Sequence, residues 1–162
     1  MRVENFGTYA EKFERYLNYE YKLIYQLGCS TGLRISDIVA MTKDKLEIER
    51  PTIKEQKTQK SKRIYIPKKL REELIEFSAK HDKYIFESKS KTGHITRQAV
   101  HKYFKRVAER LDIPKNIGTH SMRKTYARKL ILKHKNYKYV QSKLNHETLS
   151  ETLLYVLDTR EL

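Results

Sequence analysis

Apolar residues recur at helical spacing over most of the chain, which predicts a mainly helical protein. Residues 8–29 show this spacing first, with apolar side chains separated by three or four positions. The members of this series are Phe13, Leu17, Tyr21, Ile24 and Leu27. Gly32 interrupts the series, and a second helix is expected to begin near Ile35, with Ser36 or Asp37 in its first turn.

Further helices are predicted in the second half of the chain. Leu70, Leu74 and Phe77 mark a helix after Pro67, and a strongly basic amphipathic helix is expected from an N-cap at Thr96 to a stop near Pro114. Another is expected to start with Thr119 as its cap. Two short helices should follow, around residues 137–144 and 149–157.

Between these helical stretches, residues 45–66 alternate between apolar and polar positions. The alternation is weak over residues 45–49 and 52–57 and clear from Arg63 to Ile66, so three short antiparallel strands are expected, with Lys57–Lys62 in the last turn. With only 5 Gly and 3 Pro and no internal repeat, the chain shows no linker. The predicted fold is therefore mainly α with a small three-stranded antiparallel sheet (α+β), in a single domain over residues 1–162.

The charge of the chain is strongly positive and unevenly distributed. The formal net charge is +15, from 35 Lys and Arg against 20 Asp and Glu. Residues 54–69 hold seven basic residues against one acidic, and residues 97–139 hold thirteen against two, whereas the remaining segments are close to neutral. Two separate basic stretches favour a binding face for a polyanion, most commonly nucleic acid, over a surface that only aids solubility.

Cysteine content and apolar runs exclude several classes of protein. Cys29 is the only cysteine, which excludes an internal disulfide and a cysteine-only zinc site. No run is long and apolar enough for a signal peptide or a membrane span. A soluble protein that works inside the cell, without membrane contact, is expected.

The segment TGLRISD, residues 31–37, places Arg34 just after a glycine turn and at a helix start. Backbone amides and the positive end of the helix dipole can join a guanidinium there around an anion. Asp37 lies three residues later and could brace the guanidinium from behind. Taken alone, this segment is more typical of an ordinary Arg–Asp pair at a helix start.

A second segment, HSMR at residues 120–123, places His120 and Arg123 on one turn of a helix, so both side chains can reach the same point. An imidazole that exchanges protons beside a guanidinium suits phosphoryl transfer. A His-x-x-Arg spacing is common, however, and His120 as a helix cap with Arg123 as a DNA-backbone contact would explain it as well.

The third segment, LNH at residues 144–146, is followed nine residues later by Tyr155. Asn145 suits a left-handed position that ends a helix, which would expose His146 on a tight turn. Since the chain has 12 Tyr, any single one is more often a packing residue than a nucleophile.

Together, TGLRISD, HSMR, LNH and Tyr155, in this order, resemble the catalytic domain of the tyrosine recombinases, the phage integrase family. The basic segment KTQKSKRIYIP, residues 57–67, matches the family's hairpin, and the motifs span about four fifths of the chain. Three positions depart from the usual pattern, namely Met122 for Leu, Lys124 for His or Thr, and Asn145 for Gly. Family members usually carry an N-terminal DNA-binding domain, so the chain is expected to be the catalytic domain alone.

The resemblance implies a mechanism and a catalytic set. The Tyr155 hydroxyl would attack the scissile phosphate and leave a 3′-phosphotyrosyl link with a free 5′-hydroxyl. Arg34 and Arg123 would neutralise the transition state, and Asp37 would support Arg34. His146 would donate to the same phosphate, and His120 would move protons or hold the phosphate. Lys57, with Lys60 as the alternative, would protonate the leaving oxygen. Neither ATP, metal nor another cofactor is implied.

The implied partner is double-stranded DNA, held mainly through its phosphates. The expected contacts are Lys60, Lys62, Arg63, Arg97, Lys102, Lys105, Arg106 and Lys124. The resemblance also implies a homotetramer of the full-length protein on DNA, with a monomer as the alternative for this chain alone, in the cytoplasm on the nucleoid. The expected outcome is integration or excision of a mobile element or phage.

Two other functions fit many of the same residues. A type IB topoisomerase uses much the same pocket but relaxes supercoils without strand exchange. A non-catalytic DNA-binding module would use the basic helices for docking only. A metal-dependent nuclease fits poorly, because the basic stretches contain few acids and no metal-ligand spacing.

Overall fold

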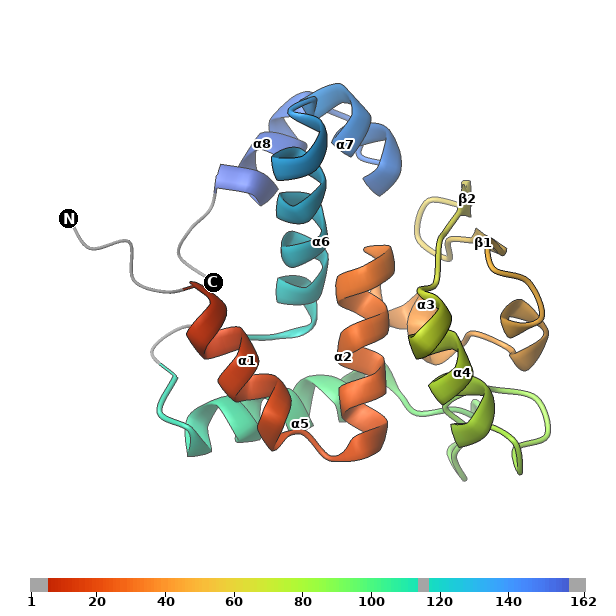
Figure 1. Ribbon diagram of the computed structural model, residues 1–162. Coiled ribbons are helices and arrows are strands. Elements are labelled where there is room, and N and C mark those ends of the chain that lie inside the picture. Colours follow the sequence, from red (N-terminus) through yellow and green to blue (C-terminus); the bar gives the residue numbers. More distant parts are fainter. Residues whose placement is uncertain (1–5, 114–116, 158–162) are drawn as a thin grey trace.

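The computed structural model describes residues 6–113 and 117–157, which form a helical protein with one small sheet. The elements in chain order are α1 (Phe6–Tyr16), α2 (Tyr19–Thr31), α3 (Ile35–Val39), the 3₁₀ helix η1 (Lys43–Leu46), β1 (Thr52–Lys54), β2 (Ser61–Arg63), α4 (Lys68–Phe77), α5 (Arg97–Arg110), α6 (Thr119–His134), α7 (Tyr137–Leu144) and α8 (Leu149–Leu157). Figure 1 shows α2 and α6 at the centre, the hairpin and α4 on one side, and α7 and α8 together at one end. No helix in the described ranges has the length and apolar character needed to cross a membrane.

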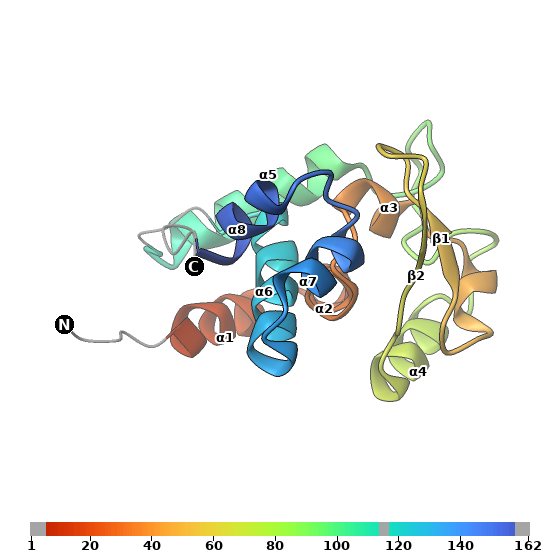
Figure 2. The same cartoon turned by 90° about the horizontal axis from the view of Figure 1, so that it is seen from above.

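The central contact is between α2 and α6, which lie side by side in both views (Figures 1 and 2). Two glycines of α2 allow this approach. A Cβ atom at Gly28 would lie 2.6 Å from the Met122 sulfur and 2.9 Å from the Met122 Cβ, and one at Gly32 would meet the ring of Tyr126. Gly32 also ends α2 in the left-handed region, at φ 64°, which costs glycine little. The chain therefore passes from α2 to Arg34 directly beside α6.

The core consists of one large cluster and one small one. Phe13, Tyr25 and Phe104 join α1, α2 and α5 through edge-to-face ring contacts at centroid distances of 5.3–6.1 Å. A separate cluster of Ala127, Val140, Leu144 and Val156 holds α6, α7 and α8 together. The end of the chain that carries Tyr155 is thus packed on its own small core.

The sheet has two strands in the described residues, so the expectation of a third strand was wrong. β1 and β2 are antiparallel, with Ile53 opposite Lys62. The stretch expected to form the third strand begins instead with η1, where the N–H groups of Lys45 and Glu47 bond to carbonyls three residues earlier. These local bonds use the donors that a ladder would need.

Two helix boundaries also differ from the expectation. The stretch over residues 8–29 is two helices, because Asn18 caps α2 by accepting a hydrogen bond from the Tyr21 N–H at 3.1 Å. Thr119 is the first residue of α6 and not its cap. The cap is Gly118, whose N–H donates to Ser121 Oγ.

The other helices agree with the sequence. Thr96 caps α5 and accepts from the Ala99 N–H, and the two short helices α7 and α8 have the expected bounds. Asn145 lies in the left-handed region at φ 52°, as predicted from the tolerance of asparagine for this conformation. Its N–H donates a hydrogen bond to carbonyls of the last turn of α7.

Gly28→Ala should destabilise the protein by about 1–2 kcal/mol, because overpacking against Met122 outweighs the better helix propensity of alanine. Urea unfolding followed by circular dichroism measures the change. Gln98→Ala, at an exposed position of α5, is the control, since it introduces alanine without any change in the core. A Gly28→Ala protein more stable than the unaltered one would contradict the close approach.

Candidate active site

Arg123 is the most deeply buried basic group of the site. It lies on the first turns of α6 with only 2% of its surface exposed. Its guanidinium donates one hydrogen bond to the carbonyl of Gly32, at 2.5 Å, and one to the carbonyl of Leu144. Arg123 thereby connects the C-terminal ends of α2 and α7, whose free carbonyls are natural acceptors for a cation.

Arg34 approaches the same place from the start of α3. It is the N-cap residue of α3, with an extended backbone at φ −72°, and its side chain makes no capping hydrogen bond to that helix. Its Nη1 forms an ion pair with Glu55 Oε2 at 3.0 Å, and the other carboxylate oxygen of Glu55 lies 3.8 Å from Arg123 Nη1. The two arginines therefore meet at one carboxylate.

Glu55 follows β1 and is completely buried. Its Oε2 also accepts hydrogen bonds from Thr58 Oγ1 at 2.8 Å and from Asn145 Nδ2 at 3.0 Å. Burial alone raises the pKa of Glu55, but these two hydrogen bonds and the two guanidinium charges outweigh that effect and lower the pKa below its ordinary value. Glu55 is therefore ionised at neutral pH.

A surface cleft of about 500 Å³ opens above the two arginines. Arg34 and Arg123 line it together with His120 from α6 and Lys57 from the turn between β1 and β2. Arg97, the first residue of α5, adds another cation. The cleft is a concave site in which guanidinium, ammonium and imidazole groups face one space, as an anion-binding site requires.

Tyr155, on α8, lies next to this cleft. Its hydroxyl is 3.2 Å from Nδ1 of His120, which lines the cleft. Its ring contacts the ring of His146 edge to face at 4.9 Å, and the Lys124 ammonium lies 5.9 Å from the ring centroid. Four of the six residues of the expected catalytic set therefore line the cleft. Tyr155 lies beside it, in contact with His120, and His146 reaches Tyr155 from the protein interior.

His146 differs from its expected exposure. It is only 6% exposed, because its ring turns inward onto α8, where Nδ1 lies 3.0 Å from Thr152 Oγ1 and Nε2 lies 3.6 Å from Glu151. Burial, followed by the Arg123 charge, lowers the pKa of His146 to about 4. The imidazole is therefore neutral at physiological pH, and its contact with Glu151 is not an ion pair there.

Asp37 occupies a different position from the one expected. Its Oδ1 accepts a hydrogen bond from the Gln56 N–H at 2.9 Å, and burial raises its pKa. Glu55, and not Asp37, makes the ion pair with Arg34. Asp37 thereby fixes the chain directly after Glu55, the residue that pairs with Arg34.

The residues expected to contact DNA divide into exposed and buried groups. Most are exposed, namely Lys60, Arg63, Arg97, Lys102, Lys105 and Arg106. Lys62 and Lys124 are only 5% and 6% exposed, which differs from the surface position expected of a phosphate contact. Lys62 Nζ donates to the Thr31 carbonyl at 2.9 Å, and burial, then the Arg123 charge, lowers its pKa to about 7.

Glu55 belongs to none of the recognised motifs, although the sequence carries a signal for it. Alternation along the hairpin places Ile53 and Glu55 inward on one strand, and Ile66, Ile64 and Lys62 inward on the other. Both charged residues therefore face the core, where each needs a partner. Among the described residues, no three His, Cys, Asp or Glu side chains are grouped as a metal ion requires.

Comparison with known proteins gives a consistent result. The model of the Phage integrase family matches residues 3–161. A probable integrase/recombinase of Bacillus subtilis, YoeC, is 30% identical over 136 residues, which cover 82% of this chain and 75% of that protein.

Two solved structures share the fold. XerA recombinase superposes with a TM-score of 0.77 at 15% identity, over 96% of this chain and 60% of XerA. XerH site-specific recombinase bound to its palindromic difH substrate superposes with a TM-score of 0.74 at 18% identity, over 93% of this chain and 48% of XerH.

The fold is that of a tyrosine recombinase catalytic domain, as these structures show. The family match extends over nearly the whole chain, so the chain belongs to the phage integrase family of tyrosine recombinases, and the resemblance seen in the sequence is confirmed.

The stability of the protein should fall between about pH 6.5 and pH 4 in part because of His146. The unfolded chain takes up a proton on this imidazole near pH 6.5, whereas the folded state keeps it neutral down to about pH 4. His146→Gln should therefore flatten the pH dependence in this range. Urea midpoints at pH 7 and pH 5 test this, with His101→Gln, which removes an exposed imidazole, as the control. If the urea midpoint changes by the same amount between pH 7 and pH 5 in the unaltered and His146→Gln proteins, the buried neutral state of His146 is contradicted.

Proposed function

We propose that this chain cleaves and rejoins DNA at specific sites through a 3′-phosphotyrosyl intermediate, with Tyr155 as the nucleophile. The observation that carries the proposal is the 3.2 Å contact between the Tyr155 hydroxyl and His120, which lines one cleft with Arg34 and Arg123. A base within hydrogen-bond reach of a hydroxyl, beside two guanidinium groups, is the arrangement that in-line attack on a phosphodiester requires.

In this reaction the Tyr155 oxygen forms a bond to phosphorus while the bond to the 5′-oxygen breaks. The negative charge that gathers on the non-bridging oxygens is neutralised by Arg34 and Arg123, whose planar donors suit a phosphoryl group. His120 takes the phenol proton. The energy of the broken bond is retained in the phosphotyrosyl link, and the free 5′-hydroxyl reverses the step in the same or a partner strand.

Lys57 is proposed as the acid that gives the 5′-oxygen its proton, with Lys60 as the alternative. Lys57 lines the cleft, whereas Lys60 does not contribute to its lining. The role of His146 is a hydrogen bond to the same phosphate. Because both ring nitrogens now face Thr152 and Glu151 on α8, that bond requires the ring or α8 to shift.

Double-stranded DNA is the proposed substrate and partner. The support is the positive charge of the cleft and the family, in which XerH is seen bound to its difH substrate. Phosphate contacts from the exposed basic residues would supply much of the affinity. Because the chain spans 48% to 60% of these two recombinases, a tetramer of the complete protein on DNA, a cytoplasmic location, and integration or excision of a mobile element stay predictions.

Tyr155→Phe should bind a nicked duplex with unchanged affinity and form no covalent adduct, because only the nucleophilic oxygen is removed. Denaturing gel electrophoresis detects the adduct, and mass spectrometry maps the modified residue. Tyr137→Phe, on α7, is the matched control and should form the adduct normally. An adduct on the Tyr155→Phe protein would remove Tyr155 from the mechanism.

Lys57→Ala should slow adduct formation by about 100-fold or more, since the leaving oxygen loses its acid. A duplex with sulfur at the 5′-bridging position needs no such acid, so the rate should recover on it. Lys54→Ala, an exposed lysine on β1, is the control. Failure of the sulfur substrate to rescue Lys57→Ala, with rescue of Lys60→Ala instead, would assign the acid to Lys60.

A further inference from the structure

We propose that Glu55 is a positioning residue for the reaction above. Its carboxylate holds Arg34 and Arg123 at a fixed separation and fixes the positions of the turns that carry Lys57 and His146. The inference rests on the proposed function. It follows from the contacts of one buried side chain with four separate segments of the chain.

The first step is that Glu55 cannot itself touch the DNA. Its side chain is completely buried, and it does not line the cleft, although both of its arginine partners do. The carboxylate therefore lies behind the guanidinium groups. Any effect that it has on a phosphate in the cleft must pass through the residues that it contacts, first of all Arg34 and Arg123.

The second step concerns charge. Arg34 and Arg123 repel each other, and Lys62 adds a third basic group, which is buried and whose pKa the neighbouring arginines lower further. Glu55 is the carboxylate that meets both guanidinium groups, at 3.0 Å and 3.8 Å. Without its charge, mutual repulsion favours separation of the two guanidinium groups in a poorly solvated space.

The third step concerns the two residues that donate hydrogen bonds to Glu55. Thr58, which donates to Oε2, is the residue after Lys57, and Asn145, which donates to the same oxygen, is the residue before His146. One carboxylate oxygen thus joins the turn of the hairpin to the turn between α7 and α8. A buried carboxylate that contacts several segments fixes geometry more than it adds stability.

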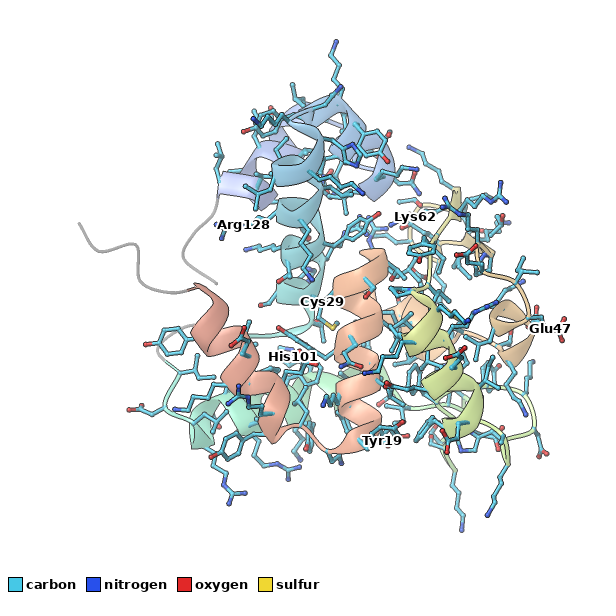
Figure 3. The ribbon with its side chains drawn as sticks, viewed as in Figure 1. Tyr19, Cys29, Glu47, Lys62, His101 and Arg128 are labelled. Carbon is cyan, nitrogen blue, oxygen red and sulfur yellow. The ribbon has the colours of Figure 1, made fainter. Side chains whose placement is uncertain are left out.

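The test compares Glu55→Gln, which keeps the shape and removes the charge, with Glu47→Gln, which removes an exposed carboxylate on the far side of the hairpin (Figure 3). Each protein is given two nicked duplexes, one with the ordinary scissile phosphate and one with a methylphosphonate there. In the methylphosphonate a methyl group replaces one non-bridging oxygen and no negative charge remains, so the position of the arginines matters less.

Glu55→Gln should form the adduct about 100-fold more slowly on the phosphate, and this loss should shrink by about tenfold or more on the methylphosphonate. Glu47→Gln should match the unaltered protein on both. Equal losses on the two duplexes would show a merely structural role and overturn the proposal, as would no loss on either.

A second variant guards against misfolding of Glu55→Gln. Asn145→Gly keeps the left-handed backbone at φ 52° and removes only the hydrogen bond to Glu55. It should slow adduct formation by about tenfold on the phosphate, with a smaller loss on the methylphosphonate. Adduct formation by Asn145→Gly at the unaltered rate would overturn the link from Glu55 to the His146 turn.

A readout without activity separates this proposal from the proposed function. In DNA-free protein, the ¹⁵N side-chain resonances of Arg34 and Arg123, assigned with Arg→Lys proteins, should move in Glu55→Gln and stay in place in Glu47→Gln. Unmoved resonances overturn the positioning role whether or not the chain cleaves DNA. Moved resonances together with no adduct from the unaltered protein reject the proposed function and still support the hold of Glu55 on the arginines.

Discussion

The burial of one guanidinium determines how the rest of the site is assembled. The Arg123 side chain is almost completely buried, so each of its N–H donors needs a partner from the protein. The carbonyls of Gly32 and Leu144 and the carboxylate of Glu55 meet this need from three different segments. Because a buried cation left unpaired is strongly destabilising, these segments can pack on α6 only in the arrangement that also forms the cleft. Fold and site are therefore held by the same contacts.

The positive charge around the Arg123 guanidinium is not fully balanced by acidic side chains. The buried carboxylate of Glu55 faces two arginines, and Lys62 lies near enough for their charges to lower its pKa. An anion in the cleft would balance the remaining positive charge, which the protein alone leaves uncompensated. Further acidic residues would stabilise the protein by balancing this positive charge, but they would weaken the attraction of the cleft for an anion. Stability and the proposed phosphate binding therefore oppose each other here.

The proposed nucleophile depends on a separate and smaller set of contacts. Tyr155 lies on α8, which packs on α6 and α7 through the minor cluster that includes Val156. Both ring nitrogens of His146 face this same helix. A displacement of α8 would therefore move the phenol and free the imidazole together, which couples two members of the proposed catalytic set mechanically.

Local patterns predicted much of this protein, and the errors have specific causes. The spacing of apolar residues located α4, α5, α7 and α8, since a helix is formed by neighbours three and four residues apart. The break at Asn18 was missed because a capping side chain can sit inside a continuous apolar pattern. The third strand was wrong because the 3₁₀ bonds of η1 satisfy the backbone within the segment itself.

The sequence by itself determined the helices, the positive charge, and the residue types able to handle a phosphate, because these follow from composition and from short-range spacing. Only the tertiary structure decided the partners. Arg34 pairs with Glu55 and not with Asp37, its neighbour along the chain, because the packing of the hairpin against α3 brings the more distant carboxylate closer. His146 likewise turned inward, since α8 folds back over the turn that presents it. Contacts between distant segments depend on how whole elements pack, and no local pattern encodes that.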